Sequence, residues 1–272
     1  MPEVKEESTS DNESEVASNS KPFHPIKGYE KTDGTMSYSI VCVISGGEKR
    51  ERDFLKTLIR HKDLYSLRVA FVSKDGQGLQ PYQMQKMWEE IQRSKTVAIS
   101  NMTIELDEMD QIFMLSDVDE FHSQLVKIIE KHKDQDRSEW IISNPCFEIW
   151  LYYCFCNDPE VDLKSIYPLE PGQRSQEMKR LGHEVVAGGL NSLKAFERMC
   201  DGISHSNSHY AEDEYGIPVL YATQMHRMAK YLVETMNRNR GEYDEFVKRQ
   251  QEWRSKMRKF HPDTTTDLHG RS

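Results

Sequence analysis

Hydrophobic and polar residues alternate in blocks along the middle of the chain. Four short runs rich in branched and aromatic residues end in polar or glycine-containing stretches, as buried strands do. They span residues 38–44, 67–73, 112–116 and 140–142. Between them, apolar residues recur every three or four positions, which is the spacing of one helix face. The alternation predicts an α/β fold with a largely parallel sheet flanked by helices.

The pattern also predicts how the chain is divided. An acidic, serine-rich tail over 1–36 is expected to be disordered, and an α/β core is expected over 37–157. The apolar stretch 146–156 predicts a buried helix. A helical part over 158–260 follows, with helices at 175–180, 190–200, 220–236 and 242–259. A loose tail is expected over 261–272.

Composition narrows the class of protein. The chain has 36 basic and 45 acidic residues, a formal net charge of −9. This balance argues against a protein that coats nucleic acid by bulk charge, but it allows an enzyme with a local basic path. No run approaches the roughly 20 apolar residues of a membrane span, and no secretory signal is expected. With five cysteines and no disulfide framework, we expect a cytoplasmic protein.

The first candidate chemistry follows the third predicted strand. Asp117 and Asp119 stand two positions apart at the strand end, and the stretch 104–120 holds seven acids and no basic residue. Two such carboxylates can converge on a hard cation such as Mg²⁺ or Mn²⁺. Alternatively, Asp119 and Glu120 simply open the next helix as capping residues.

The end of the first strand offers a second motif. Gly46 and Gly47 precede a predicted helix, where a tight turn lets a phosphate approach backbone N–H groups. Glu48 and Glu51 fall in the first helical turn. Acids at this position also occur simply because they compensate the helix dipole.

The fourth strand ends in the string Ser-Asn-Pro-Cys-Phe-Glu-Ile-Trp-Leu over 143–151. Its unusual residue is Glu148, a carboxylate within an otherwise apolar helix. Such a group must be paired, bound to metal or protonated. A structural pair with a buried arginine or lysine is the main alternative to a functional role.

Basic residues gather near the C-terminus. They are interleaved with Trp253 and Phe260, as in segments that contact nucleic acid. A solvated amphipathic helix explains the same pattern. The residues that would bind nucleic acid are Lys248, Arg249, Arg254 and Lys256.

Taken in order, these strings resemble the RloB-like family, which is associated with bacterial anti-phage and restriction-linked loci and has a Toprim-type catalytic core. The resemblance runs over about 38–234 and is firmest over 143–151. It implies a Toprim-like sheet, with Asp117, Asp119 and Glu51 as ligands of Mg²⁺ or Mn²⁺. It also implies that Lys49 contacts the scissile phosphate and that Glu148 is the family's motif glutamate.

The chain departs from the family pattern at three positions. Gly46 stands where the family has its first glutamate, and Glu48 is the nearest residue that could replace it. Cys154 stands where the family has a histidine, and Arg50 where it has a threonine. Loss of the strand-end glutamate removes a ligand or general base.

Two functions are therefore expected. The first is a metal-dependent nuclease that cuts phosphodiester bonds, with RNA such as tRNA preferred over DNA, acting in anti-phage defence. The second is a catalytically degenerate Toprim-like binding or scaffold protein. Family context suggests a partner ATPase of the AAA or SMC-like type, because the chain itself has no Gly-x-x-x-x-Gly-Lys-Ser/Thr motif.

Overall fold

The computed structural model describes residues 39–60, 67–74, 78–99, 102–108, 110–132 and 137–260. Beyond residue 241, only some side chains are described. The predicted tails over 1–36 and 261–272 lie outside this part of the chain.

Four parallel strands form the central sheet. Their order across the sheet is β2 (Leu67–Val72), β1 (Ser39–Ser45), β5 (Gln111–Asp117) and β6 (Ser138–Ser143). In register, Val41 lies opposite Val69 on one side and opposite Gln111 on the other. The predicted α/β class, the parallel sheet and all four strand positions are confirmed.

The strand order places a switch point between β1 and β5, where a crevice is expected. From β1 the chain crosses to β2 on one side, and later returns to place β5 on the other side. Connections that leave two neighbouring strands in opposite directions open a gap at their carboxyl ends, where ligands bind in open α/β sheets. The residues that follow β1 and β5 are therefore the first place to look for a site.

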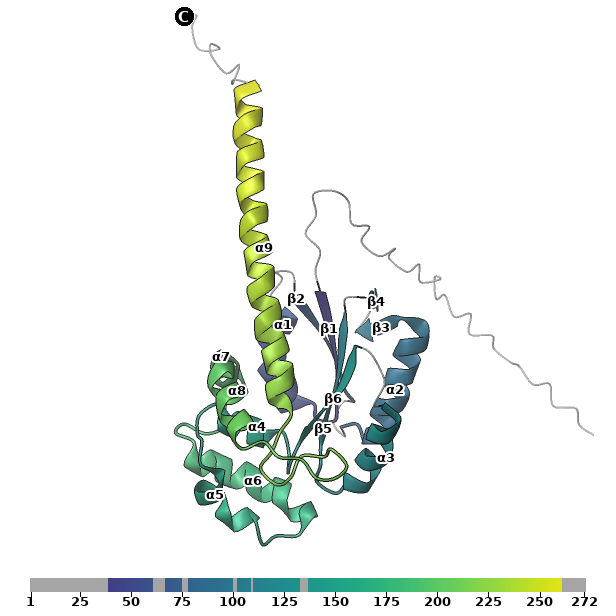
Figure 1. Cartoon of the computed structure of the whole chain (residues 1–272), viewed down its shortest axis with the longest axis vertical. Coiled ribbons are helices and arrows are strands. Elements are labelled where there is room, and N and C mark those ends of the chain that lie inside the picture. The colour runs from purple at the N-terminus through teal and green to yellow at the C-terminus, as the bar shows by residue number, and fades with distance from the viewer. Residues whose placement is uncertain are drawn as a thin grey trace, which may run out of the picture.

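Helices cover both faces of the sheet (Figure 1). Val41 and Val43 of β1 point toward α1 (Lys49–Arg60), while Cys42 and Ile44 point toward the other face. That second face is covered by α2 (Pro81–Ser94) and α3 (His122–His132). Successive strand residues point to opposite faces, so each strand must be apolar throughout to fill both layers.

A short antiparallel hairpin precedes β5 and was not predicted. It consists of β3 (Thr96–Ile99) and β4 (Met102–Glu105), and it forms its own two-stranded sheet. Val97 anchors it in the apolar layer below α2. With four residues per strand, the hairpin has too little alternation for a pattern to stand out.

The remaining helices pack mostly on the α1 face. They are α4 (Glu148–Tyr153), α5 (Pro159–Asp162), the 3₁₀ helix η1 (Lys164–Ile166), α6 (Pro171–Val185), α7 (Ser192–Glu197), α8 (Met199–Ser208) and α9 (Met225–Phe260). All six side chains of α4 are buried, as predicted for the stretch around it. Its neighbour α1 meets it through Phe54, whose ring contacts Trp150 edge-on at 6.0 Å.

The two helices predicted at 220–236 and 242–259 are one continuous helix, α9, so that division was wrong. Gly241 lies within it, and a single glycine costs a helix only about 1 kcal/mol. Figure 1 shows the C-terminal part of α9 extending past the sheet. None of the helices described is both long and apolar enough to cross a membrane.

Candidate functional site

Three carboxylates meet at the carboxyl ends of the strands. Glu51 lies in the first turn of α1, Asp117 ends β5, and Glu148 begins α4. Burial, above all, raises the pKa of Glu51 to about 7, and the nearby Glu148 carboxylate adds to this rise. Burial also raises the pKa of Asp117 well above its usual range, with further contributions from Glu51 and Glu148. The structure thus brings together three of the residues predicted from sequence.

Gly47 positions Glu51. The Glu51 carboxylate folds back over the turn that follows β1, and a Cβ atom at position 47 would overlap it. A side chain at 47 would therefore displace the Glu51 carboxylate from its position at the strand end. This gives the second glycine of the turn a specific role.

A backbone hydrogen bond fixes Asp117. The N–H of Phe147, just before α4, donates to Asp117 Oδ1 at 2.8 Å. A hydrogen bond to the charged form lowers a carboxyl pKa, and this one opposes the effect of burial. Asp117 is therefore held toward the start of α4.

Arg50 neutralises Glu148. Its Nε lies 3.1 Å from Glu148 Oε1, and the Glu148 side chain is buried. The same guanidinium donates to the Leu190 carbonyl at 3.2 Å and lies 3.0 Å from His183 Nε2. The structural pair considered for Glu148 is therefore present, and it joins α1 to α4, to α6 and to the segment after α6.

Lys179 of α6 belongs to the same cluster, and the sequence did not single it out. Burial lowers the pKa of Lys179. The charges of Glu148, Asp117 and Glu51, together with Cys146, raise it by more than burial lowers it, so the net shift is upward. In return, Lys179 lowers the pKa of Glu51 and of Asp117. No motif surrounds this lysine, so only the packing of α6 against α4 could reveal it.

The other predicted residues make different contacts. Asp119 is in the turn after β5 with φ at 28°, and its N–H donates to the Pro145 carbonyl at 3.3 Å. The contacts described for Asp119 do not join it to Glu51 or Asp117. Glu48 pairs with Arg52 at 3.7 Å, and Lys49 is exposed.

The backbone of Leu79 and Leu115 lies close to Gly46, the position where the family has a glutamate. The Gly46 N–H donates to the Leu115 carbonyl at 2.8 Å, and its own carbonyl accepts from Leu79 N–H at 2.9 Å. A Cβ at position 46 would lie 3.1 Å from the Leu79 oxygen. A glutamate there would require the segment around Leu79 to move.

Cys154 lies in the core. Its side chain is fully buried beside Trp150, and a Cβ at Gly202 would come within 2.8 Å of its sulfur. Burial raises the pKa of the Cys154 thiol, so it stays neutral. The position where the family has a histidine is filled by a packing residue here.

The oxygens of the cluster suit a hard cation only in part. Within the described ranges, no three His, Cys, Asp or Glu side chains are placed to hold one metal ion. Mg²⁺ is often bound by one or two carboxylates, with water and substrate phosphate completing its shell. Glu51 and Asp117 fit that arrangement. Ser45 Oγ and Asp119 Oδ1, also at the strand ends, are buried without a hydrogen-bond partner among the residues described.

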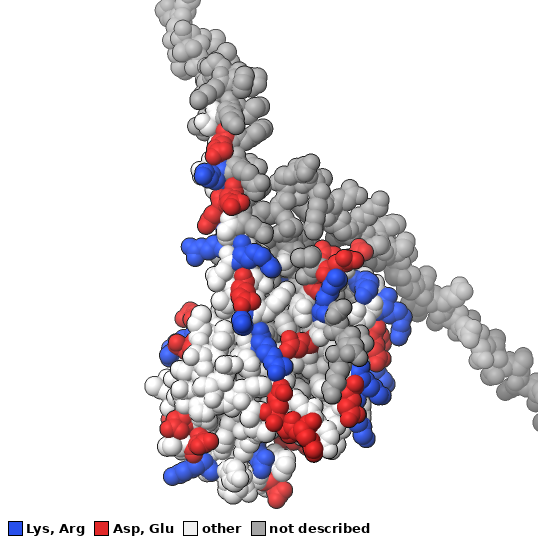
Figure 2. Space-filling model, in the orientation of Figure 1, with Lys and Arg blue, Asp and Glu red and all other residues white. Residues whose placement is uncertain are grey.

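The basic residues predicted to bind nucleic acid lie on the C-terminal half of α9. Lys248 is exposed, whereas the side chains of Arg249, Arg254 and Lys256 are outside the described part. On the face drawn in Figure 2, basic and acidic side chains are interspersed rather than segregated. A nucleic-acid contact on α9 stays a prediction.

Comparison with family models now adds to this geometry. The model described as RloB-like protein matches residues 40–232. The chain belongs to the RloB-like family. The match begins in β1 and ends in α9, so it includes the three clustered carboxylates, Arg50 and Lys179 of this RloB-like chain. Searches of curated proteins and of solved structures give no match.

Proposed function

We propose that this RloB-like chain is a nuclease that hydrolyses phosphodiester bonds with Mg²⁺ or Mn²⁺ held by Glu51 and Asp117. The observation that carries this proposal is the cluster of Glu51, Asp117 and Glu148 in the crevice between β1 and β5. Besides burial, the Glu148 carboxylate raises the pKa of Glu51, and Glu51 and Glu148 raise the pKa of Asp117. A protein that keeps like charges buried together sacrifices stability, and such groups concentrate at functional sites.

The chain's own residues would have distinct roles. A bound divalent cation would neutralise phosphate oxygens and make a water molecule a better nucleophile. Asp117 is held in place by the Phe147 N–H, and Glu51 by the turn at Gly47. Lys179 would attract a phosphate of the substrate into the crevice, and Arg50 would brace α1 against α4.

The substrate and setting follow from the family alone. By that analogy we propose RNA such as tRNA before DNA, an anti-phage role in the bacterial cytoplasm, and control by a partner ATPase of the AAA or SMC-like type. Asp119, Glu48 and Lys49 remain predicted site residues.

A second function is favoured by two specific observations. Glu148 is already neutralised by Arg50, and Gly46 leaves no acid at the end of β1. Both suit a Toprim-like protein that binds a nucleic acid or a partner without cutting it. The two functions differ in whether bound nucleic acid is cleaved.

The test compares the purified chain with Asp117→Asn and with Asp201→Asn, an exposed acid on α8. Each protein is incubated with total tRNA and with plasmid DNA in Mg²⁺, Mn²⁺ or EDTA. Binding of Mn²⁺ is measured separately by calorimetry. For a nuclease we expect cation-dependent cutting by the parent chain and by Asp201→Asn, and at least about a hundredfold loss in Asp117→Asn.

The outcomes separate the two functions. Cutting that persists in Asp117→Asn would exclude the proposed site. Binding of tRNA without cutting, and without Mn²⁺ binding, would establish the scaffold. Phage plating on cells that express the parent chain or Asp117→Asn then tests the defence role.

A further inference from the structure

The outer edge of the sheet is only half covered. Along the C-terminal half of β6, the Gln224 N–H donates to the Ile142 carbonyl at 2.9 Å, and Ile142 N–H donates to Gln224 Oε1 at 3.0 Å. An antiparallel bridge joins Ser143 and Thr223. At Met225 the chain turns away into α9, so this covering segment ends before it reaches the N-terminal half of β6.

The backbone of Trp140 faces outward at that uncovered half. The Ile112 N–H donates to the Arg137 carbonyl, and Val118 N–H donates to the Ser143 carbonyl. In a parallel ladder these bonds turn residues 137, 139, 141 and 143 toward β5, and they turn Trp140 away from it. In the part of the chain that the structure describes, no backbone group pairs with Trp140 on the outer side.

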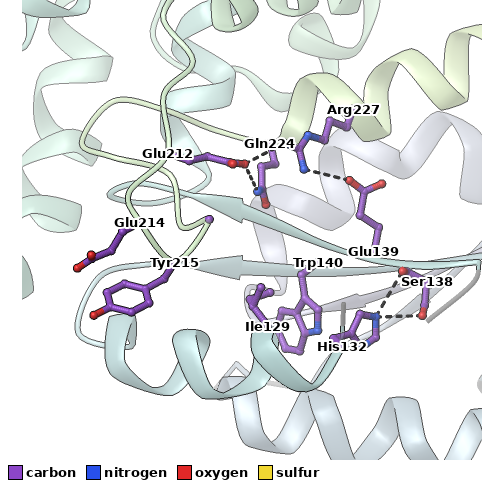
Figure 3. Close-up of a pocket in the computed structure, with 11 residues that line it drawn as sticks. Ile129, His132, Ser138, Glu139, Trp140, Glu212, Glu214, Tyr215, Gln224 and Arg227 are labelled. Carbon is purple, nitrogen blue, oxygen red and sulfur yellow. Dashed lines mark hydrogen bonds and ion pairs between the residues drawn. The ribbon is translucent and has the colours of Figure 1, made fainter. Parts of the chain in front are cut away.

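A pocket of about 390 Å³ lies along this stretch of edge (Figure 3). Ser138, Glu139 and Trp140, three consecutive strand residues, all line it. Because consecutive strand residues point to opposite faces, one pocket can reach all three only along the strand's edge. The pocket therefore gives a ligand access to the outward backbone of Trp140.

The walls of the pocket are acidic and aromatic. Glu139, Glu212 and Glu214 line it together with one arginine, Arg227, which lies 3.4 Å from Glu139 and 2.9 Å from Glu212. Tyr215 lines the pocket as well, on the side of the 212–216 loop in Figure 3. Three carboxylates against one guanidinium leave an excess of negative charge.

Two ring nitrogens in the pocket lining have no partner. Trp140 Nε1 and His132 Nδ1 belong to side chains that are 3% and 8% exposed, and both lack a hydrogen-bond partner among the residues described. Buried polar atoms in native proteins are usually satisfied. Both side chains line the pocket beside the open strand edge, so their signals report on what binds there.

We propose that this edge binds an extended segment of a partner protein that carries a lysine or arginine. The segment would add to β6 by exchanging backbone hydrogen bonds with Trp140, in the manner of β-strand addition. Its basic side chain would lie near Glu214, against the exposed ring of Tyr215. A second copy of this chain fits less well, because pairing two such edges would bring identical acidic groups together.

This site is separate from the carboxylate cluster. It lies at the amino end of β6, whereas the cluster lies at the carboxyl ends of the strands. The proposal therefore stands whether or not the chain is a nuclease.

Short synthetic peptides provide the probe. An acetylated, amidated Thr-Val-Arg-Val-Thr peptide is compared with Thr-Val-Glu-Val-Thr and with a copy of the arginine peptide in which the central amide is N-methylated. Binding to the full chain is followed by ¹H–¹⁵N NMR, in which the four tryptophans give four indole signals and Trp140 is one of them. The protein variants are Glu214→Lys and, as a matched control on α2, the exposed Glu90→Lys.

We expect the arginine peptide to shift the backbone and indole signals of Trp140. N-methylation and Glu214→Lys should each weaken binding by about tenfold or more, and Glu90→Lys should leave it unchanged. The proposal is overturned if no peptide shifts Trp140, if the glutamate peptide binds equally well, or if N-methylation has no effect. Dimerisation through this edge, shown by a concentration-dependent mass that Trp140 signals follow, would overturn it as well.

Discussion

Arg50 and Glu148 form an ion pair, with Nε and Oε1 3.1 Å apart, that closes one side of the carboxylate cluster. The pair joins the first turn of α1 to the first turn of α4. The two other arms of the guanidinium are bound to Leu190 and His183. One side chain thus ties together four segments around the crevice.

Replacing Arg50 with methionine should destabilise the protein by about 2–4 kcal/mol, because the Glu148 carboxyl would stay buried beside two other acids without its arginine partner. The double variant Arg50→Met/Glu148→Gln should recover about 1–3 kcal/mol of this loss. Urea denaturation of the parent, both single variants and the double variant measures the coupling. If the losses simply add, the pair has no coupling free energy.

Asp117→Asn should stabilise the folded protein by about 1 kcal/mol in EDTA. The pKa of Asp117 is raised, so its charged form is disfavoured by folding, while an asparagine oxygen can still accept from Phe147 N–H. Thermal denaturation measures the change. The control Asp201→Asn should stay within about 0.5 kcal/mol of the parent. A clear loss of stability in Asp117→Asn would make Asp117 a structural residue.

Gly78→Ala should cost about 2–3 kcal/mol of stability. Gly78 has a φ of 67°, and a Cβ there would overlap the carbonyl oxygen of Gly46. Gly172→Ala, in the first turn of α6, is the matched control. A Cβ at 172 meets nothing within 4 Å, so alanine should be neutral or slightly stabilising there. Equal effects of the two substitutions would contradict the close approach at Gly46.

His132 should make stability depend on pH. Burial lowers its pKa from the ordinary value of 6.5, so the folded state favours the neutral ring. Its contribution is fully present above pH 6.5 and is lost as the pH falls toward the pKa of the folded state. Urea denaturation between about pH 7.5 and about pH 5.5 should show a smaller decline in His132→Gln than in the parent. Burial also lowers the pKa of His226. His226 is present in both the parent and His132→Gln, so it does not affect the difference between them.

The strands were predictable because each is buried on both faces and therefore apolar throughout. Val41 and Val43 serve one layer and Cys42 and Ile44 the other, which leaves a continuous run in the sequence. The hairpin of β3 and β4 was not predictable from the sequence, because its short strands are half exposed. The continuity of α9 through Gly241 depends on helix context that no local pattern conveys.

The site was predictable where residues follow strands. Glu51 and Asp117 could be expected near one another from the rule that carboxyl ends of parallel strands share an edge. The positions of Lys179 and of Arg50, the partner of Glu148, could not be expected from the sequence, because tertiary packing brings α6 and α4 to the crevice. The neutralising role of Arg50 rests on a contact between residues far apart in sequence.

The order of the strands has a consequence for synthesis. β1 and β5 are neighbours in the sheet, yet a crossover to β2, a helix and a hairpin separate them along the chain. Glu148 follows later, and Lys179 later still. Contacts between distant segments form after local ones, so a nascent chain on the ribosome has no assembled crevice until α6 has emerged. If the chain is the nuclease proposed above, the nascent polypeptide would lack its assembled active site for most of the time that it is being made.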